Sequence, residues 1–133
     1  MLDGWKAYIC SPLSAATKKE ILHNMDMARF YMEKMAKLYH CRCFASHAYL
    51  PLMLDDTIPE ERMLALRIGK ELMALCDVVI ICGRRISSGM EGEIREAFSK
   101  GMGVYWYDGP AKPFEIMRMK DWRDVEHAVQ ICT

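Results

Sequence analysis

The sequence lacks an excess of charge of either sign, and it also lacks a long apolar run. Its 18 lysines and arginines balance 18 aspartates and glutamates, which gives a formal net charge of zero. Nucleic-acid-binding domains need a basic patch or stripe, so the composition predicts no nucleic-acid partner. The longest purely apolar run is about five residues, whereas a membrane-spanning helix needs about 20. We therefore expect neither a nucleic-acid-binding protein nor a membrane protein.

The N-terminus lacks the layout of a secretory signal peptide. Residues 1–10, MLDGWKAYIC, lead directly into a predicted strand. They contain no apolar segment followed by a small-residue cleavage site. A cytoplasmic location is therefore predicted.

Cysteine and histidine are present, but their spacing does not indicate a metal site. The six cysteines form no C-x-x-C pair, and no cluster of histidine, aspartate and glutamate has ligand spacing. Three of the cysteines lie in apolar strand-like runs, where a thiol usually behaves as a small hydrophobic group. Cys41 and Cys43 are predicted to point to opposite faces of one strand. We predict reduced thiols, no metal and no cofactor.

The sequence does contain an alternation of strand-like and helix-like segments. Short runs rich in branched and aromatic residues occur at residues 5–10, 41–45, 78–82 and 104–107, and amphipathic patterns follow them. A turn is predicted at Asp108–Gly109–Pro110, before the last helix. The alternation predicts one domain spanning the 133 residues, an α/β three-layer sandwich of the flavodoxin or Rossmann type. Its mostly parallel sheet should have four or five strands in the order 2-1-3-4, with any fifth strand next to the fourth.

Helix starts are indicated by Ser/Thr-x-x-Glu sequences, in which the hydroxyl and the carboxylate cap the first turn reciprocally. They occur at residues 17–20, 57–60 and 88–91, and Pro59 lies early in the second of them. Asp121 is expected to cap the last helix. The buried face of the second helix is predicted from residues at helical spacing: Leu64, Ile68, Leu72 and Leu75.

Residues 83–97, GRRISSGMEGEIREA, join the strongest strand signal to a helix start. Open α/β sheets build ligand sites in this way, because the loop lies at the carboxyl end of the strand and the helix offers unpaired N–H groups. Glu93 should fall in about the first turn of this helix, where a carboxylate aimed into a cleft is a candidate nucleophile or base. The alternative is that Glu93 only stabilises the helix, as many acidic residues in first turns do.

Two other loops should lie on the same edge of the sheet. In the strand order 2-1-3-4, the switch point falls between the first and third strands. This order brings the Ser11–Pro12 loop beside the Gly83–Gly89 loop and places His47 on the same rim. His47 is either a contact to a bound base or a structural, hydrogen-bonded histidine. Arg84 and Arg85 are expected to face solvent, with phosphate contact as the alternative.

Four segments, taken in order, carry a resemblance to a known family. They are YICSP at residues 8–12, SHAYLP at 46–51, CDVVIICG at 76–83 and SSGMEGEIREAFSKG at 87–101. With this order and spacing, the chain resembles the nucleoside 2-deoxyribosyltransferase-like superfamily over roughly residues 5–107. It is particularly similar to a small branch with an S-P loop and a G-M-x-x-E helix.

The resemblance implies chemistry at the N-glycosidic bond of a nucleoside or nucleoside 5′-monophosphate. In the superfamily a helix glutamate, matched here by Glu93, attacks the anomeric carbon and releases the base; water or another base then completes the reaction. Tyr8 matches a tyrosine that orients this carboxylate by a hydrogen bond. Members often complete their sites across a dimer or higher oligomer, so a homo-oligomer is implied. The residues expected to contact substrate are Ser11, Pro12, His47 and Gly83, with Ser88, Gly89 and Met90 on the sugar or 5′-phosphate side.

Two positions depart from the pattern of active members. Gly69 stands where many of them carry an aspartate that contacts the sugar or shuttles a proton, and Ser11 replaces a common glycine. An acidic residue of the 55–61 segment is a candidate substitute for that aspartate. Three functions therefore stay open: an N-glycosidase or deoxyribosyltransferase, a non-catalytic binder of a nucleotide or nucleotide signal, and a scaffold whose cleft is vestigial.

Overall fold

A five-stranded sheet lies at the centre of the computed structural model, which describes residues 2–13, 15–107 and 115–132. Its strands, in the spatial order β2-β1-β3-β4-β5, are β1 (Lys6–Cys10), β2 (Arg42–Phe44), β3 (Val78–Cys82), β4 (Gly103–Tyr107) and β5 (Ile116–Met119). The first four strands are parallel, and β5 pairs with β4 in the antiparallel direction. The predicted order is confirmed, and the fifth strand lies next to the fourth.

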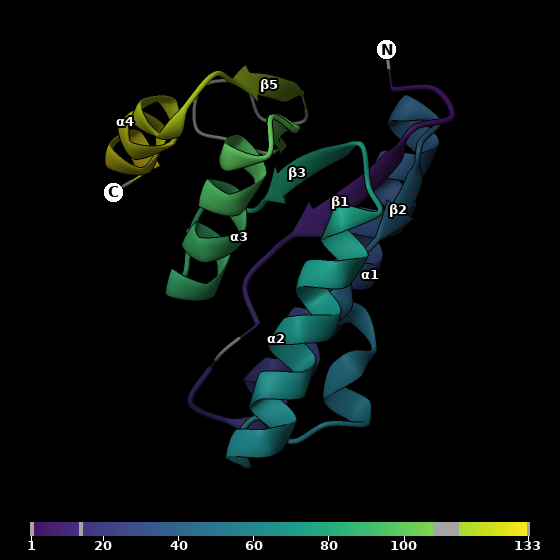
Figure 1. Cartoon of the computed structure of the whole chain (residues 1–133), viewed down its shortest axis with the longest axis vertical. Coiled ribbons are helices and arrows are strands. Elements are labelled where there is room, and N and C mark those ends of the chain that lie inside the picture. Colours follow the sequence, from purple (N-terminus) through teal and green to yellow (C-terminus); the bar gives the residue numbers. More distant parts are fainter. Residues whose placement is uncertain (1, 14, 108–114, 133) are drawn as a thin grey trace.

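Helices cover both faces of this sheet (Figure 1). The helices are α1 (Lys18–Tyr39), α2 (Pro59–Ala74), α3 (Ser88–Ser99) and α4 (Trp122–Cys132), and the short 3-10 helices η1 (Ser46–Ala48) and η2 (Leu50–Leu52) follow β2. Because side chains alternate along a strand, Ala7 and Ile9 of β1 pack in the core under α1, while Tyr8 and Cys10 pack in the core under the other helices. The arrangement is the predicted three-layer sandwich.

Two of the predicted cap residues, Thr17 and Asp121, are confirmed. The Thr17 side chain accepts a hydrogen bond from the Glu20 amide at 3.1 Å and caps α1. The Asp121 carboxylate accepts one from the Arg123 amide at 2.9 Å, directly before α4. These contacts satisfy amides that the first turn of a helix leaves unpaired.

The predicted cap of α2 is wrong. The residue before the helix is Ile58, which makes no side-chain cap, and Pro59 occupies the first helical position. Proline has no N–H to satisfy and a fixed φ that suits this position, so it starts the helix without a polar cap. Thr57 instead turns back, and its amide and hydroxyl both bind the Asp55 carboxylate, at 2.9 and 2.7 Å.

The face that α2 presents to the protein also differs from the predicted one. Its buried residues are Gly69 and Met73. A Cβ built on Gly69 would lie 3.4 Å from Ser46 Oγ and 3.7 Å from the Tyr8 hydroxyl, so the helix backbone itself packs against these groups. The predicted face is less buried: Leu64, Ile68 and Leu72 are half-buried, and Leu75, beyond the helix end, is 65% exposed. A prediction from large apolar residues misses a contact made through glycine.

Gly69→Ala is expected to stabilise the protein by about 0.5–1 kcal/mol. The new methyl group would meet Ser46 Oγ at 3.4 Å, an ordinary contact distance, and alanine reduces the freedom of the unfolded chain. Gly101→Ala is the matched control, because Gly101 has a φ of +71° and open space around it. Backbone strain alone should then destabilise that variant by about 1 kcal/mol or more. Urea unfolding measures both, and a destabilised Gly69→Ala would contradict the described packing of α2.

The cysteines correct one further prediction. Cys41 and Cys43 do not point to opposite faces: residues two apart on an extended chain share a face, and their Sγ atoms are 3.7 Å apart. The five cysteines with described side chains are free thiols. Within the described ranges, no group of three or more His, Cys, Asp or Glu residues could hold a metal ion, and no helix is long and apolar enough to cross a membrane. The predicted turn at residues 108–110 lies outside the described residues.

Candidate functional site

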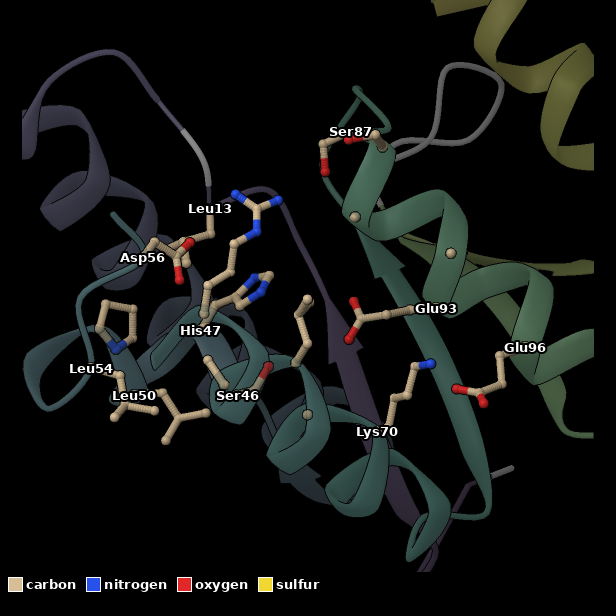
Figure 2. Close-up of a pocket in the computed structure, with 18 residues that line it drawn as sticks. Leu13, Ser46, His47, Leu50, Leu54, Asp56, Lys70, Ser87, Glu93 and Glu96 are labelled. Carbon is tan, nitrogen blue, oxygen red and sulfur yellow. The ribbon is translucent and has the colours of Figure 1, made fainter. Parts of the chain in front are cut away.

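A cavity of about 390 Å³ opens at the carboxyl ends of β1, β2 and β3 (Figure 2). Its lining includes Leu13 after β1, Ser46 and His47 after β2, and residues 87–89 after β3. The side walls come from α2 and α3. Open α/β sheets bind ligands at this edge, and the volume falls within the usual range of about 300–1,000 Å³ for ligand pockets.

The start of α3 sets where its side chains point. Ser87 caps the helix by accepting a hydrogen bond from the Met90 amide at 3.3 Å. The helix begins at the predicted place, near Ser87 and Ser88. The predicted pairing of Ser88 with Glu91 is wrong, since Glu91 accepts a hydrogen bond from Arg95, one turn further on. Glu93 therefore lies in the second turn rather than the first. The dipole effect fades beyond the first turn, so other groups must determine the state of Glu93.

Two side chains of β1 donate hydrogen bonds to the Glu93 carboxylate. The Tyr8 hydroxyl donates to Oε2, and the Cys10 thiol donates to Oε1 over an S–O distance of 3.6 Å. Tyr8 and Cys10 are two residues apart on the strand, so both side chains stand on the sheet face that α3 covers. One donor to each oxygen fixes the orientation of the carboxylate.

Ser46 extends this hydrogen-bond chain. Its hydroxyl oxygen lies 2.8 Å from that of Tyr8, and both residues are buried. An ionised carboxylate only accepts, so the Tyr8 hydrogen lies toward Glu93 and the Ser46 hydroxyl donates to Tyr8. The order is therefore Ser46 to Tyr8 to Glu93, from η1 through β1 to α3.

Burial governs the ionisation of this group. Desolvation raises the pKa of the Glu93 carboxyl above its ordinary value, while the hydrogen bond from Tyr8, the charge of His47 and the Cys10 thiol act in the opposite direction. Burial, and then the charge of Glu93, raise the pKa values of Tyr8 and Cys10. Both side chains consequently keep their protons at neutral pH and remain donors to Glu93.

Glu93→Gln is expected to raise the free energy of unfolding at pH 7 by on the order of 1 kcal/mol. The folded-state pKa lies above the unfolded value, so the native state binds this proton more tightly, and stability falls as pH rises through that window. The gain should vanish near pH 3.5, roughly, where the carboxyl is protonated in both states. Urea unfolding across this pH range tests the prediction, and a gain of equal size at both ends would exclude burial of charge as its cause.

His47 lies across the cavity from Glu93 (Figure 2). Its Nδ1 is 3.0 Å from the carbonyl oxygen of Ser11. Because a carbonyl oxygen only accepts, Nδ1 carries a hydrogen, and Nε2 is the nitrogen that gains and loses a proton. The hydrogen bond to the first loop thus fixes both the ring orientation and its tautomer.

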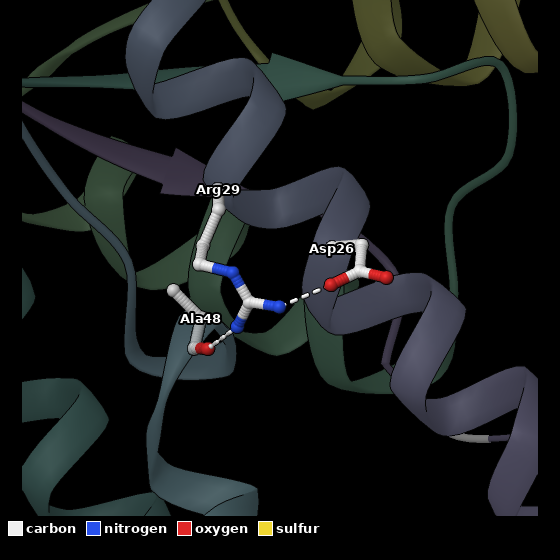
Figure 3. A network of polar contacts seen from close by, with 3 residues as sticks. All are labelled: Asp26, Arg29 and Ala48. Atoms are coloured by element: carbon white, nitrogen blue, oxygen red, sulfur yellow. Dashed lines mark hydrogen bonds and ion pairs between the residues drawn. The ribbon is translucent and has the colours of Figure 1, made fainter.

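Arg29 holds the η1 segment against α1 (Figure 3). Its guanidinium donates to the Ala48 carbonyl at 2.5 Å and also pairs with Asp26, which lies one turn earlier on α1. Ala48 directly follows His47. The segment that presents His47 is therefore fixed on both sides, through Ser46 to β1 and through Ala48 to α1.

The structure brings five of the predicted site residues together. Glu93, His47, Ser88 and Gly89 line the cavity, and Tyr8 contacts Glu93. The other four are not part of this lining: Ser11 accepts the bond from His47, Pro12 precedes the lining residue Leu13, Met90 is fully buried in the core, and the Gly83 carbonyl accepts a 2.6 Å bond from Trp106. Gly83 has a φ of +98°, a conformation that favours glycine.

Sequence patterns did not indicate the α2 wall of the cavity. Arg62, Leu66, Gly69 and Lys70 line it at helical spacing. The sequence signal for this wall is the stripe itself, a mixture of charged and small residues at helical spacing. It lies next to the apolar face that is predicted for the helix. Asp56, an acidic residue of the 55–61 segment and so a candidate substitute for the aspartate that Gly69 replaces, lies at the lip of the same cavity.

The sheet order and the position of the cavity define a doubly wound α/β protein with a ligand-site cavity at the carboxyl ends of its parallel strands. The 2-deoxyribosyltransferase of the psychrotolerant bacterium Bacillus psychrosaccharolyticus, a biocatalyst for nucleoside synthesis, has a similar structure. The TM-score is 0.58, and the match covers 91% of this chain and 90% of that chain. The sequence identity is 18%, so the likeness concerns the fold, and at that level it confirms the resemblance of the four segments.

Sequence comparison gives the family. A family model described as "Domain of unknown function (DUF7768)" matches residues 5–107, and the chain belongs to this family. No curated protein matches the chain.

Proposed function

We propose that this protein cleaves the N-glycosidic bond of a nucleoside or nucleoside 5′-monophosphate, with Glu93 as the nucleophile. The observation that carries the proposal is the Glu93 carboxylate, which faces the cavity with one donor on each oxygen, Tyr8 and Cys10. A half-buried and oriented carboxylate is suited to an oxocarbenium-like transition state, because a lowered dielectric strengthens its electrostatic effect. The fold shared with a 2-deoxyribosyltransferase supports the same class of reaction.

The lining of the cavity suits the parts of such a substrate. Leucines from two loops, η2 and α2 supply apolar surface for a flat base: Leu13, Leu54, Leu50 and Leu66. Ser87, Ser88 and Gly89 lie at the N-terminus of α3, where unpaired N–H groups favour sugar oxygens or a 5′-phosphate. We therefore place the sugar against α3, beside Glu93, and the base toward η1 and the leucines.

The reaction proceeds in two displacements. Glu93 attacks the anomeric carbon, the C–N bond breaks, and the base leaves with its electron pair. Tyr8 and Cys10 hold the carboxylate in line for this attack. Water, or a second base in a transferase, then attacks the same carbon and releases the Glu93 carboxylate.

A non-catalytic binder is the second candidate, and the α2 wall favours it. The buried, cavity-lining position of α2 is Gly69, which supplies no acid beside Tyr8 and Glu93. The same cavity would then hold a nucleotide or nucleotide-derived signal without cleaving it.

A homo-oligomer is part of the proposal. Large apolar side chains are exposed at η2, directly after it and on α2: Leu52, Met53, Met63 and Leu66 are 66%, 69%, 71% and 55% exposed. Leu66 also lines the cavity, so a second copy on this face would cover part of its mouth. Light scattering at several protein concentrations measures the oligomeric state.

Base release from a panel of substrates tests the proposed function. The purified protein is incubated with ribo- and deoxyribonucleosides and their 5′-monophosphates, with and without a second free base, and products are separated by chromatography. Base release supports the enzyme, and dependence on the second base identifies a transferase. A monophosphate that raises the melting temperature without base release supports the binder. If the protein shows neither base release nor a raised melting temperature, both candidate functions are contradicted.

A further inference from the structure

Cleavage of the N-glycosidic bond requires a proton donor, because a base that departs as an anion is a poor leaving group. We propose that His47 is this donor, an inference that rests on the function proposed above. Its Nε2–H protonates the base as it leaves, and the neutral ring then removes a proton from the water or second base that completes the reaction.

The geometry of displacement decides on which wall the donor must lie. A nucleophile attacks the anomeric carbon from the side opposite the leaving group, so the acid and the nucleophile flank the scissile bond. Glu93 projects from α3, and His47 projects from η1 on the facing wall (Figure 2). The two groups are close enough for the charge of His47 to lower the pKa of Glu93. A nucleoside placed between them has its anomeric carbon toward Glu93 and its base toward His47.

The other titratable groups of the lining lie on different walls, and two of them, Arg62 and Lys70, are on α2. Glu96 is on α3 itself, one turn after Glu93, and so stands on the side of the nucleophile. Lys70 extends from α2 toward Glu96 (Figure 2). Asp56 is exposed at the lip, and Gly69 leaves the buried part of the α2 wall without an acid. His47 alone among these described groups faces Glu93 from the wall where the base would leave.

Hydrogen bonds fix the tautomer and the position of His47, as a proton donor requires. Nδ1 donates to the Ser11 carbonyl at 3.0 Å, so this nitrogen keeps its hydrogen while Nε2 exchanges one. The preceding residue, Ser46, is bonded to Tyr8 at 2.8 Å, and the following residue, Ala48, is bonded to α1 at 2.5 Å. The donor and the nucleophile are therefore positioned by the same chain, since Tyr8 contacts both Ser46 and Glu93.

The protons balance over the two steps. In the first, the proton of Nε2 passes to a ring nitrogen of the base, the C–N bond breaks, and a bond forms between the anomeric carbon and a Glu93 oxygen. In the second, neutral His47 takes a proton from water as the water oxygen bonds to that carbon and the ester to Glu93 breaks. The products are free base and free sugar, and the starting charges of Glu93 and His47 are restored.

Leaving groups that need no proton separate this role from a structural one. His47→Asn is compared with the wild type on 2′-deoxyguanosine and its N7-methyl derivative, and on 2′-deoxyuridine and its 5-nitro derivative, as nucleosides and as 5′-monophosphates. N7-methylguanine leaves as a neutral molecule, and 5-nitrouracil departs readily as an anion. We expect kcat to fall roughly 10²-fold or more on the unmodified substrate and less than about fivefold on its activated partner.

Equal losses on both members of a pair, or no loss on either, would overturn the role of His47 while leaving the proposed function intact. A wild type that cleaves none of the substrates would instead overturn the proposed function, and the inference with it. Glu96→Gln is the matched control on the opposite wall; a selective loss there, rather than in His47→Asn, would assign the proton to Glu96.

A second variant covers a failure of His47→Asn to fold, which its melting temperature reveals. In His47→Gly, added imidazole should restore cleavage of the unmodified substrate and leave cleavage of the activated one unchanged. The contradicting outcome is a folded His47→Gly protein that still cleaves the activated substrate slowly, but in which imidazole restores cleavage of neither substrate. That result would count against proton donation by His47.

Discussion

Glu93→Gln should abolish base release, lowering kcat by roughly 10³-fold or more. Glutamine keeps the size of the side chain and an oxygen that accepts from Tyr8, so the cavity should stay intact. Its neutral amide neither forms the glycosyl ester nor stabilises positive charge at the anomeric carbon. Single-turnover release of base, with the substrate that the panel identifies, measures the effect.

The control for this loss is Glu96→Gln. Glu96 lies one turn further along α3 and lines the same cavity. In the described contacts its carboxylate makes only a 3.8 Å ion pair with Lys100, and it is not bonded to Tyr8 or Cys10. Its charge has the smallest effect of the neighbouring groups on the pKa of Glu93. Its replacement should leave kcat within about threefold of the wild type. Similar losses in both variants would mean that the charge of the wall matters rather than a nucleophile at position 93.

Tyr8→Phe is expected to lower kcat/KM roughly 10²-fold at neutral pH and to move the acid limb of the pH profile to higher pH. The hydrogen bond from Tyr8 lowers the pKa of Glu93, against the effect of burial. Without the Tyr8 hydrogen bond, less remains to offset the effect of burial, and the pKa of Glu93 rises further. A larger fraction of Glu93 is then protonated and inactive as a nucleophile at a given pH.

The shift of the acid limb is the informative part of this result. A lower rate with an unmoved limb would mean that Tyr8 contacts the substrate instead of controlling Glu93. Tyr105→Phe is the matched control, because the Tyr105 hydroxyl accepts a bond from Arg118 on neighbouring β5 and lies outside the cavity lining. Ser46→Ala should fall between the two, since Tyr8 loses its own donor but still donates to Glu93.

Much of the fold is predictable from local patterns. The buried run 78–82 and the short runs before it read as strands because branched and aromatic residues cluster there, and helices between strands require a parallel order. The four-residue strand β5, with sequence IMRM, was not located, because it is short and follows a segment rich in turn residues. It pairs with β4 in the antiparallel direction. An antiparallel connection needs no crossover helix, so no helical pattern before β5 indicates the strand.

The candidate site is predictable only in part. The resemblance pairs Tyr8 with Glu93, and the structure places them in contact. Its apolar strand-like run predicts Cys10 as a small hydrophobic residue, whereas its spacing of two from Tyr8 places it on the same face of the strand. The bond between Ser46 and Tyr8 depends on residues far apart in the sequence, and no local pattern indicates it.

Gly69 shows why the remaining wall was missed. A glycine in a helix reads as a weak position, and the predicted face was built from leucines and isoleucine. In the structure the glycine is buried because the α2 backbone approaches the hydroxyls of Ser46 and Tyr8. Such a contact is set by how three elements meet, which hydrophobic periodicity does not encode.

A covalent sugar on Glu93 is the most direct test of the proposed mechanism. The protein is incubated with 2′-deoxy-2′-fluoroarabino nucleosides and their 5′-monophosphates, whose fluorine slows the second displacement, and is then examined by intact-mass and peptide mass spectrometry. We predict one added sugar or sugar phosphate per chain, located on the peptide that contains Glu93 and absent from Glu93→Gln. Base release without any adduct, or an adduct on another residue, would contradict Glu93 as the nucleophile.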